Sequence, residues 1–237
     1  DAMGTAEISA TEAIEGETVT LTATPNNDYV FKHWALNGNV VSTQNPYIAI
    51  VTSNSEYVAV FEIRTYNTYE YVDLGLSVKW ATCNVGATTP EGYGDYFAWG
   101  ETTTKSSYTS GNYTYSSNPI TLPLSADAAR VNWGGKWRMP TKAEQEELSN
   151  RGNCTWTWTT QNGVIGYKVT SNKNGNSIFL PAAGYCDGIS VSDAGSSGYY
   201  WTSSLSTGDS SNAYYFSFSS YNLAMFDYYR YYGHSVR

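Results

Sequence analysis

Short stretches in which apolar and polar residues alternate recur along most of this 237-residue chain. In ETVTLTAT (17–24), Val19, Leu21 and Ala23 face one way and threonines face the other, which is the pattern of a half-buried strand. Similar runs predict further strands within 29–36, 46–51, 57–62, 71–87, 94–101, 155–159, 165–170, 177–184, 198–203, 213–219, 223–230 and 234–237. Strands this short are stable only when several pair into sheets, so the pattern predicts a molecule built of small sheets.

Helical signals occur at two places between the strands. In SADAARVNW, Ser125 is the expected N-cap of a first helix. In PTKAEQEELSNR (140–151), Thr141 and Glu144 form a capping box behind Pro140, and glutamates occupy the first turns, where the helix dipole favours them. Two helices embedded among many short strands predict the α+β fold class.

A polar segment, IRTYNTY (63–69), separates two parts of different composition. Residues 1–62 have the pattern of a small antiparallel β module. Residues 70–237 hold both helices, and within them residues 102–119 are rich in Thr, Ser, Tyr and Asn, which predicts a long surface loop. We therefore expect two domains joined by a linker at 63–69.

Composition limits the partners of the chain. Its net charge of −8 and pI near 4.7 argue against nucleic acid and against anionic membranes, which both attract basic surfaces. No run of 18 apolar residues occurs, so we expect no direct membrane insertion. Few charges and abundant hydroxyl and aromatic residues are typical of extracellular β proteins. From this composition we expect an extracellular or cell-surface location, although no leader peptide opens the chain.

Three cysteines leave two interpretations open. The odd count permits at most one disulfide within the chain, for which Cys83 and Cys154 are one candidate pair. The alternative is that Cys83, Cys154 and Cys186 are small buried side chains. Their spacing matches no CxxC-type zinc site.

The N-terminal part resembles the divergent internalin-type B repeat. The resemblance lies in GETVTLTATPNNDYVFKHW, in the Asn37-Gly38 pair that predicts a type I′ hairpin, and in the closing YVAVFE. It implies a spacer or stalk module of a bacterial surface protein. Trp34 and Phe31 are then core residues rather than binding residues.

The C-terminal part resembles the Fibrobacter succinogenes major paralogous domain. The resemblance rests on YVDLGLSVKWATCNVGA, DYFAWGE, WRMPTKAEQEEL, CTWTWT, FLPAAGY, GYYW and the terminal GHSVR, in that order. It implies a C-type-lectin-like fold, which is shared with formylglycine-generating enzymes. WRMPTKAEQEEL is similar to a WRLPTEAEWE segment of those enzymes, with Gln145 where they have tryptophan.

The same resemblance implies a route to sequence variation. Domains of this type are targets of diversity-generating retroelements, which rewrite adenines in a C-terminal variable region. Residues 197–237 are dominated by Tyr and Ser with Asn, Asp and Gly between them, which is the composition that such rewriting of Asn codons leaves.

The sequence holds no arrangement that indicates catalysis. His33 and His234 fall in different predicted domains without a nucleophile motif, and no GxSxG elbow occurs. Gly92-Tyr93-Gly94 lacks the third glycine of a dinucleotide loop, because Phe97 occupies its place. Formylglycine-generating enzymes need cysteines near the end of the domain, where this chain has none. We expect no enzyme activity, no catalytic residue and no cofactor.

Calcium-dependent sugar binding is also not indicated. The EPN, QPD and WND motifs that surround calcium in C-type lectins are absent. Asp187 and Asp193 lie in glycine-rich loop sequence and are the candidate ion ligands. We interpret them as solvated turn residues and predict no metal site.

Alternation in the last strands separates core from surface. In AYYFSFS (213–219), Tyr214, Phe216 and Phe218 are expected in the core, together with Tyr200 and Trp201. Leu223 and Met225 then point inward, and Ala224, Phe226 and Tyr228 point outward, where a large apolar side chain such as Phe226 indicates a contact surface. The alternative is a tyrosine-rich core whose hydroxyls are all hydrogen-bonded. Tyrosine suits such a surface because it gives rigid contact area at a low entropic cost. The predicted ligand contacts are Ser206, Asp209, Tyr215, Ser217, Phe226, Asp227, Tyr229 and Tyr231.

These observations predict a secreted or surface-anchored bacterial protein that recognises an external protein or glycan without chemistry. A structural component of a surface or fimbria-like assembly is the first alternative. A degenerate relative of formylglycine-generating enzymes is the second.

Overall fold

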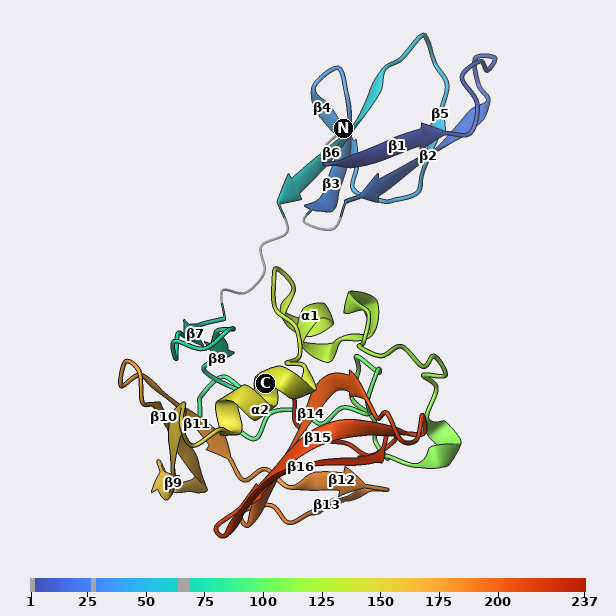
Figure 1. Ribbon diagram of the computed structural model, residues 1–237. Coiled ribbons are helices and arrows are strands. Elements are labelled where there is room, and N and C mark those ends of the chain that lie inside the picture. The colour runs from blue at the N-terminus through green and yellow to red at the C-terminus, as the bar shows by residue number, and fades with distance from the viewer. Residues whose placement is uncertain (1–2, 27–28, 64–68) are drawn as a thin grey trace. The chain divides into compact units, whose positions relative to one another are not determined.

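The computed structural model describes residues 3–26, 29–63 and 69–237 (Figure 1). The chain divides into two compact units, Asp1–Tyr66 and Asn67–Arg237. Residues 64–68 of the predicted linker lie outside the described residues. No helix in the described ranges has the length and apolar character needed to cross a membrane.

The N-terminal unit consists of two three-stranded antiparallel sheets. One has the order β1 (Gly4–Ile8), β2 (Thr18–Pro25), β5 (Tyr47–Ile50), and the other has the order β4 (Asn39–Ser42), β3 (Tyr29–Leu36), β6 (Tyr57–Ile63). Trp34 is 1% exposed at the centre of the core, and Phe31 packs against that core, as predicted. Asn37 and Gly38 both have positive φ, 52° and 78°, which confirms the tight turn between β3 and β4.

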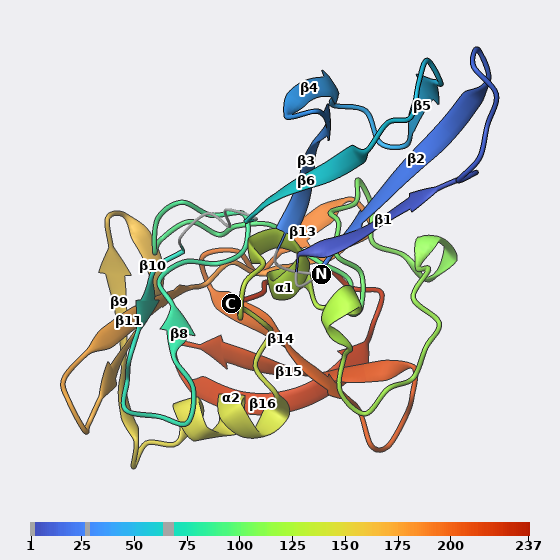
Figure 2. The same ribbon diagram turned by 90° about the horizontal axis from the view of Figure 1, so that it is seen from above.

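The C-terminal unit is mostly β-structure with two short helices. Its two larger sheets are antiparallel, with the orders β11 (Ser177–Pro181), β10 (Val164–Ser171), β9 (Cys154–Gln161) and β14 (Ser197–Leu205), β15 (Asn212–Ser219), β16 (Asn222–Tyr229). Two small pairs join β7 (Tyr71–Val72) to β8 (Trp80–Ala81) and β12 (Tyr185–Asp187) to β13 (Ser190–Ser192). In Figures 1 and 2, helix α2 (Lys142–Ser149) lies against the β14–β16 sheet.

Helix α1 (Ala128–Trp133) begins later than the sequence predicts. Ser125 lies in a short 3-10 turn (Leu124–Ala126), and Asp127 is the N-cap instead. Its carboxylate accepts from the backbone N–H of Arg130 at 2.9 Å and from that of Met139 at 2.8 Å. Asp127 therefore caps α1 with one carboxylate oxygen, and its other oxygen binds the backbone of the segment that leads to α2. Burial raises the pKa of this carboxyl group.

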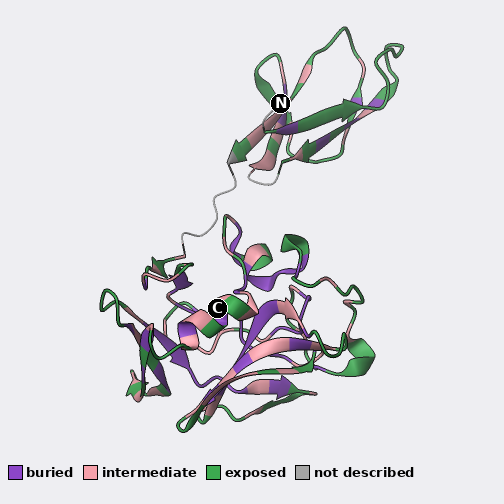
Figure 3. Cartoon of the chain, in the orientation of Figure 1, coloured by how far each residue is buried: buried purple, intermediate pink, exposed green. Residues whose placement is uncertain are grey.

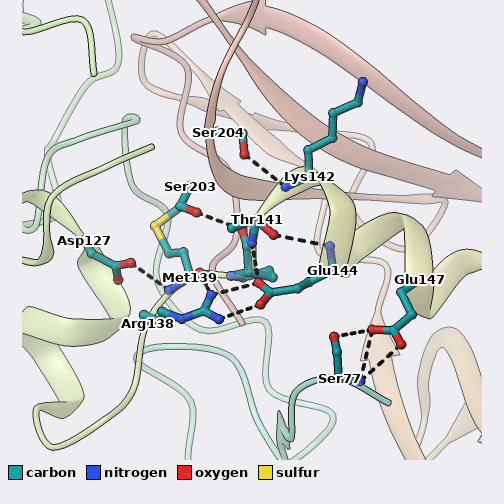
Figure 4. A network of polar contacts seen from close by, with 11 residues as sticks. Ser77, Asp127, Arg138, Met139, Thr141, Lys142, Glu144, Glu147, Ser203 and Ser204 are labelled. Atoms are coloured by element: carbon teal, nitrogen blue, oxygen red, sulfur yellow. Dashed lines mark hydrogen bonds and ion pairs between the residues drawn. The ribbon is translucent and has the colours of Figure 1, made fainter. Parts of the chain in front are cut away.

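The capping box predicted for α2 is confirmed, and it belongs to a larger polar network (Figure 4). The Glu144 carboxylate accepts from the Thr141 N–H at 2.8 Å and binds both terminal nitrogens of Arg138, at 2.8 and 2.5 Å. The backbone N–H of Lys142 donates to Ser204 Oγ at 3.0 Å, and the N–H of Ser203 donates to the Pro140 carbonyl at 2.7 Å. These bonds fix the end of β14 to the start of α2.

Strand β14 separates two hydrophobic clusters. Its residue Tyr200 joins Phe216 and Phe218 in one cluster, which includes Leu148 of α2. The next residue, Trp201, belongs to the other cluster. All four aromatic residues predicted as core at 200, 201, 216 and 218 are at most 2% exposed. Burial decreases from β14 to the edge strand β16, as Figure 3 shows, so the sheet is buried at one edge and open at the other.

Two predicted strands are replaced by single bridges. In the segment 94–101, only Phe97 pairs, with His234. In the predicted strand 234–237, Ser235 makes a further bridge, to Tyr200. The segment His234–Ser235 therefore passes between Phe97 and β14. It makes one or two backbone hydrogen bonds with each neighbour instead of the regular ladder of a sheet. Alternation could not distinguish such a buried, irregular segment from a strand.

Two tyrosines anchor the predicted surface loop at 102–119 to the preceding segment of the chain. Tyr108 is 4% exposed and its hydroxyl donates to the Tyr96 carbonyl oxygen, while the Tyr113 hydroxyl donates to the Trp99 carbonyl at 2.7 Å. A short 3-10 turn, Ser110–Asn112, lies between them. The segment lacks strands, as predicted, but part of it is packed rather than solvated.

Limited proteolysis tests this organisation. We expect first cleavage within 63–69, because proteases prefer polar segments between compact units. The released C-terminal fragment should keep its circular dichroism spectrum and its protected amides. Early cleavage at 102–119 would contradict the packing of Tyr108 and Tyr113, and an unfolded C-terminal fragment would contradict the division into two units.

All three cysteines are free and buried. The interpretation as small buried side chains therefore holds, and the Cys83–Cys154 pair does not form in this structure. Burial raises the pKa of the Cys186 thiol to about 11, so the group is a protonated, unreactive thiol at neutral pH.

Candidate ligand-binding surface

The β14–β16 sheet divides the predicted contact residues between its two faces. Tyr215 and Ser217 of β15 and Phe226 of β16 lie on the face opposite α2, because Phe216, Met225 and their neighbours take the α2 side. Tyr215 pairs directly with Phe226, and their ring centroids are 6.0 Å apart. Phe226 is 45% exposed, which is a large exposure for an apolar side chain on a strand.

Rings from three other segments extend this face. Tyr199 of β14 stacks beside Tyr215 at 5.9 Å, and Tyr185 of β12 lies edge-on to Tyr199 at 4.8 Å. Tyr232, which follows β16, lies 5.8 Å from Tyr185 and closes the row. Distances of 4.5–7 Å between centroids are those of favourable aromatic pairs.

The tyrosines of the final tract complete the set. Tyr229 stacks on Tyr231 at 5.4 Å, Tyr231 on Tyr232 at 4.7 Å, and Tyr228 lies 5.1 Å from both Tyr229 and Tyr232. Each of these rings keeps some exposure. We call the connected set the aromatic surface, and it comprises Tyr185, Tyr199, Tyr215, Phe226, Tyr228, Tyr229, Tyr231 and Tyr232.

Three predicted contact residues, Ser206, Asp209 and Asp227, lie away from these rings. Ser206 is 7% exposed, and its hydroxyl donates to Asp227 Oδ2 at 2.6 Å and accepts from the Gly208 N–H at 3.1 Å. Asp227 lies on the α2 side of the sheet, opposite Tyr214. Asp209 accepts from the Ser211 N–H at 2.8 Å, a bond that lowers the pKa of its carboxyl group. These side chains stabilise the turn between β14 and β15, and the structure does not bring them to the aromatic surface.

Tyr214 corrects a core prediction. It shares the α2 side with Phe216, but it belongs to the open end of the sheet rather than to a hydrophobic cluster. Its hydroxyl lies 2.8 Å from the Thr207 hydroxyl, and Lys142 Nζ lies 4.2 Å from the centre of its ring. The Thr207 hydrogen bonds lower the pKa of Tyr214.

Sequence reasoning missed four members of the aromatic surface: Tyr185, Tyr199, Tyr228 and Tyr232. Alternation placed Tyr228 on the outward face with Phe226, although Tyr228 was not among the predicted contacts. Tyr199 and Tyr185 come from strands whose sequence positions give no indication that they lie beside β15. Only the sheet order and the β12 placement bring them there.

The floor beneath the aromatic surface is buried and uncharged. His234 is 2% exposed and stacks on Trp201 with ring centroids 4.0 Å apart. Its ring also lies 4.8 Å from that of Tyr215. Burial lowers the pKa of His234 to about 3 and raises that of Tyr215 to about 12, so both groups are neutral near pH 7. The surface can therefore stack and exchange hydrogen bonds, but these two groups offer no charge for acid–base chemistry.

Within the described ranges, no group of three or more His, Cys, Asp or Glu side chains is arranged to hold a metal ion. Asp187 and Asp193 are both exposed, and Asp193 Oδ2 accepts from the Tyr199 hydroxyl at 2.7 Å. The Asp193 carboxylate therefore orients a ring of the aromatic surface.

Calcium removal tests this interpretation. We expect that a chelator leaves the melting temperature within about one degree, because an ion bound only to the folded state would raise it through mass action. A fall of several degrees that added calcium reverses, and that Asp193→Asn abolishes, would assign an ion site to these aspartates.

Comparison with known proteins identifies the N-terminal unit only. Residues 1–65 match the family model described as the divergent InlB B-repeat domain, which confirms the predicted internalin-type repeat. Such domains are typical of bacterial surface proteins. No curated protein and no solved structure matches the chain.

Proposed function

We propose that this chain is a bacterial surface protein that recognises an external protein or glycan through the aromatic surface of its C-terminal unit. The unit at 70–237 is then a C-type-lectin-like binding domain of the major paralogous type, and the N-terminal repeat is its spacer. The location is extracellular or at the cell surface. The proposed activity is binding, without enzymatic chemistry and without a cofactor.

The observation that carries the proposal is the connected set of eight partly exposed rings on a rigid support. Aromatic side chains dominate the energies of protein interfaces, and tyrosine loses little entropy on binding. Tyr215 and Tyr199 are set against buried Trp201 and His234, so they are already in place before a ligand arrives. A preorganised surface loses less free energy to ordering when it binds.

The same arrangement supports diversification of this surface. Phe226, Tyr228 and Tyr229 are each at least 43% exposed on the edge strand, while Leu223 and Met225 of the same strand pack against the hydrophobic cluster on the α2 side. Exposed positions on a supported strand tolerate substitution at about 0.5 kcal/mol each. Retroelement rewriting of these codons would thus change the ligand and keep the fold.

Two arrays test the proposal, one of bacterial and host glycans and one of surface proteins, each probed with the labelled full chain. We expect saturable binding to a restricted set of members. The structural alternative predicts no such binding and concentration-dependent polymers by light scattering. That pair of results would overturn the recognition proposal.

A further inference from the structure

A second site lies beside the β14–β15 turn and is separate from the aromatic surface. A hollow of about 320 Å³ opens there to solvent. That volume is at the lower end of small-molecule sites, which span roughly 300–1,000 Å³. The residues that line it include Tyr113, Thr114 and Tyr115 of the 102–119 segment, Ser210 and Ser211 of the turn, and Arg230.

Arg230 is the unusual member of this lining. It is only 8% exposed, and none of the ion pairs in the described part of the chain includes it. Its Nη1 donates to the Ser117 carbonyl oxygen at 2.9 Å, whereas its Nε is buried without a hydrogen-bond partner among the described residues. A buried guanidinium without a carboxylate is costly unless a ligand supplies the anion.

The neighbourhood of Arg230 holds it in place but does not neutralise it. Its guanidinium carbon lies 5.4 Å from the ring centre of Tyr113 and 5.5 Å from that of Trp99. The nearby Glu101 carboxylate is engaged elsewhere, because it accepts from the Thr114 N–H at 2.7 Å and forms an ion pair with Lys105 at 2.5 Å. After the hydrogen bonds from Ser211, the positive charge of Arg230 also helps to lower the pKa of the Asp209 carboxyl group in the β14–β15 turn, but no carboxylate of the described residues forms an ion pair with the guanidinium.

Tyr115 gives a second, independent indication. Its hydroxyl is buried and has no hydrogen-bond partner within the described residues, although its ring packs edge-on against Trp99 at 5.9 Å. Buried polar atoms are almost always paired, so an unpaired one beside a hollow points to a missing partner. Two buried polar atoms without a partner among the described residues, Arg230 Nε and the Tyr115 hydroxyl, thus belong to side chains that line the same hollow.

We propose that this hollow binds the carboxylate of an acidic sugar of the hexuronic acid class. A carboxylate matches the fork of N–H groups on a guanidinium. The sugar hydroxyls would exchange hydrogen bonds with Thr114, Ser210 and Ser211, and the C–H face of the ring would pack on Tyr113. The hydroxyl-rich lining favours a sugar over an acidic peptide, because Thr114, Ser210 and Ser211 match the several hydroxyls of a sugar ring. The proposal does not rest on the aromatic surface, with which the hollow shares no residue.

Calorimetric titration of the full chain with glucuronate, glucose and a glutamate-containing peptide tests the proposal. Glucose has the same ring without the carboxylate. We expect glucuronate to bind with a Kd of about 1 mM or tighter, and glucose and the peptide to bind at least about tenfold more weakly. Equal affinity for glucuronate and glucose, or no binding of glucuronate, overturns the proposal. Tighter binding of the peptide assigns the hollow to peptides and also overturns it.

Variants establish that the binding occurs in this hollow. Arg230→Gln should abolish glucuronate binding, and Arg230→Lys should weaken it, since lysine keeps the charge but loses the fork. Because Arg230 is buried, Tyr115→Phe is the variant that keeps the proposal testable if those two unfold. It removes only a hydroxyl without a protein partner, so it should keep the fold and weaken glucuronate binding several-fold.

Tyr221→Phe, at a tyrosine 91% exposed, is the matched control. Unchanged glucuronate affinity in a folded Tyr115→Phe and a folded Arg230→Gln would place the binding elsewhere.

Discussion

Replacement of Phe216 by alanine will destabilise the C-terminal unit by about 3–5 kcal/mol, the range for loss of a buried aromatic side chain. Phe216 is 1% exposed, and its ring lies 5.4 Å from that of Trp156 and 6.1 Å from that of Phe218. The cavity left by alanine would open between β15 and the β9–β11 sheet. Loss on this scale is a large fraction of the roughly 5–15 kcal/mol by which folded domains are stable.

The matched control is Phe226→Ala, which changes the same residue type on the neighbouring strand. Phe226 is 45% exposed, so its loss should cost about 0.5 kcal/mol. Urea unfolding followed by tryptophan fluorescence measures both, because every tryptophan except Trp34 lies in the C-terminal unit. Equal destabilisation by the two variants would mean that the tyrosine-rich strands are core on both faces, and the binding surface would lose its basis.

The second large effect is a loss of stability in acid that depends on His234. Burial lowers the pKa of this group from 6.5 to about 3 in the folded chain. The unfolded chain therefore takes up a proton below about pH 6.5, while the folded chain resists it. The contribution to stability is complete above pH 6.5 and is lost as the pH falls toward 3. At pH 4 the loss reaches about 3 kcal/mol.

His234→Phe isolates this effect from the titration of carboxylates. Phenylalanine keeps the stacking on Trp201, and it breaks no bond at Nδ1, which has no partner among the described residues. Urea unfolding at pH 7 and pH 4 should show that the parent chain loses about 3 kcal/mol more than the variant. Equal losses in the two proteins would mean that His234 takes up its proton in the folded chain as readily as in the unfolded chain.

Local patterns in the sequence predicted much of the fold. Alternation separated Phe216 and Phe218 from Tyr215 and Ser217 correctly, because the two faces of β15 meet different environments. The capping box at Thr141 and Glu144 was evident because its parts lie within one turn of the chain. The segment around Phe97 was misread, since its backbone bonds to the distant His234 and no local pattern records that partner.

The candidate site was less accessible to such reasoning. Alternation assigns faces but not neighbours. The predicted contacts included both Phe226 and Asp227, although alternation itself puts consecutive residues on opposite sides of a strand, as is found in β16. Tyr185 joins the surface through the pairing of Cys186 with Gly233, a contact between segments far apart in sequence. Arg230 was not predicted as a site residue, because its burial and its lack of an ion pair are visible only in the folded chain.

The affinity of single alanine variants for a ligand found on the arrays tests the central claim most directly. Phe226→Ala and Tyr228→Ala each remove a ring from the aromatic surface, and Tyr221→Ala removes a more exposed tyrosine from the turn between β15 and β16. We predict that each of the first two weakens binding by about thirtyfold or more, which corresponds to about 2 kcal/mol, and that Tyr221→Ala changes it less than about twofold. All three variants should melt within a few degrees of the parent. Unchanged affinity in folded Phe226→Ala and Tyr228→Ala would contradict recognition through this surface.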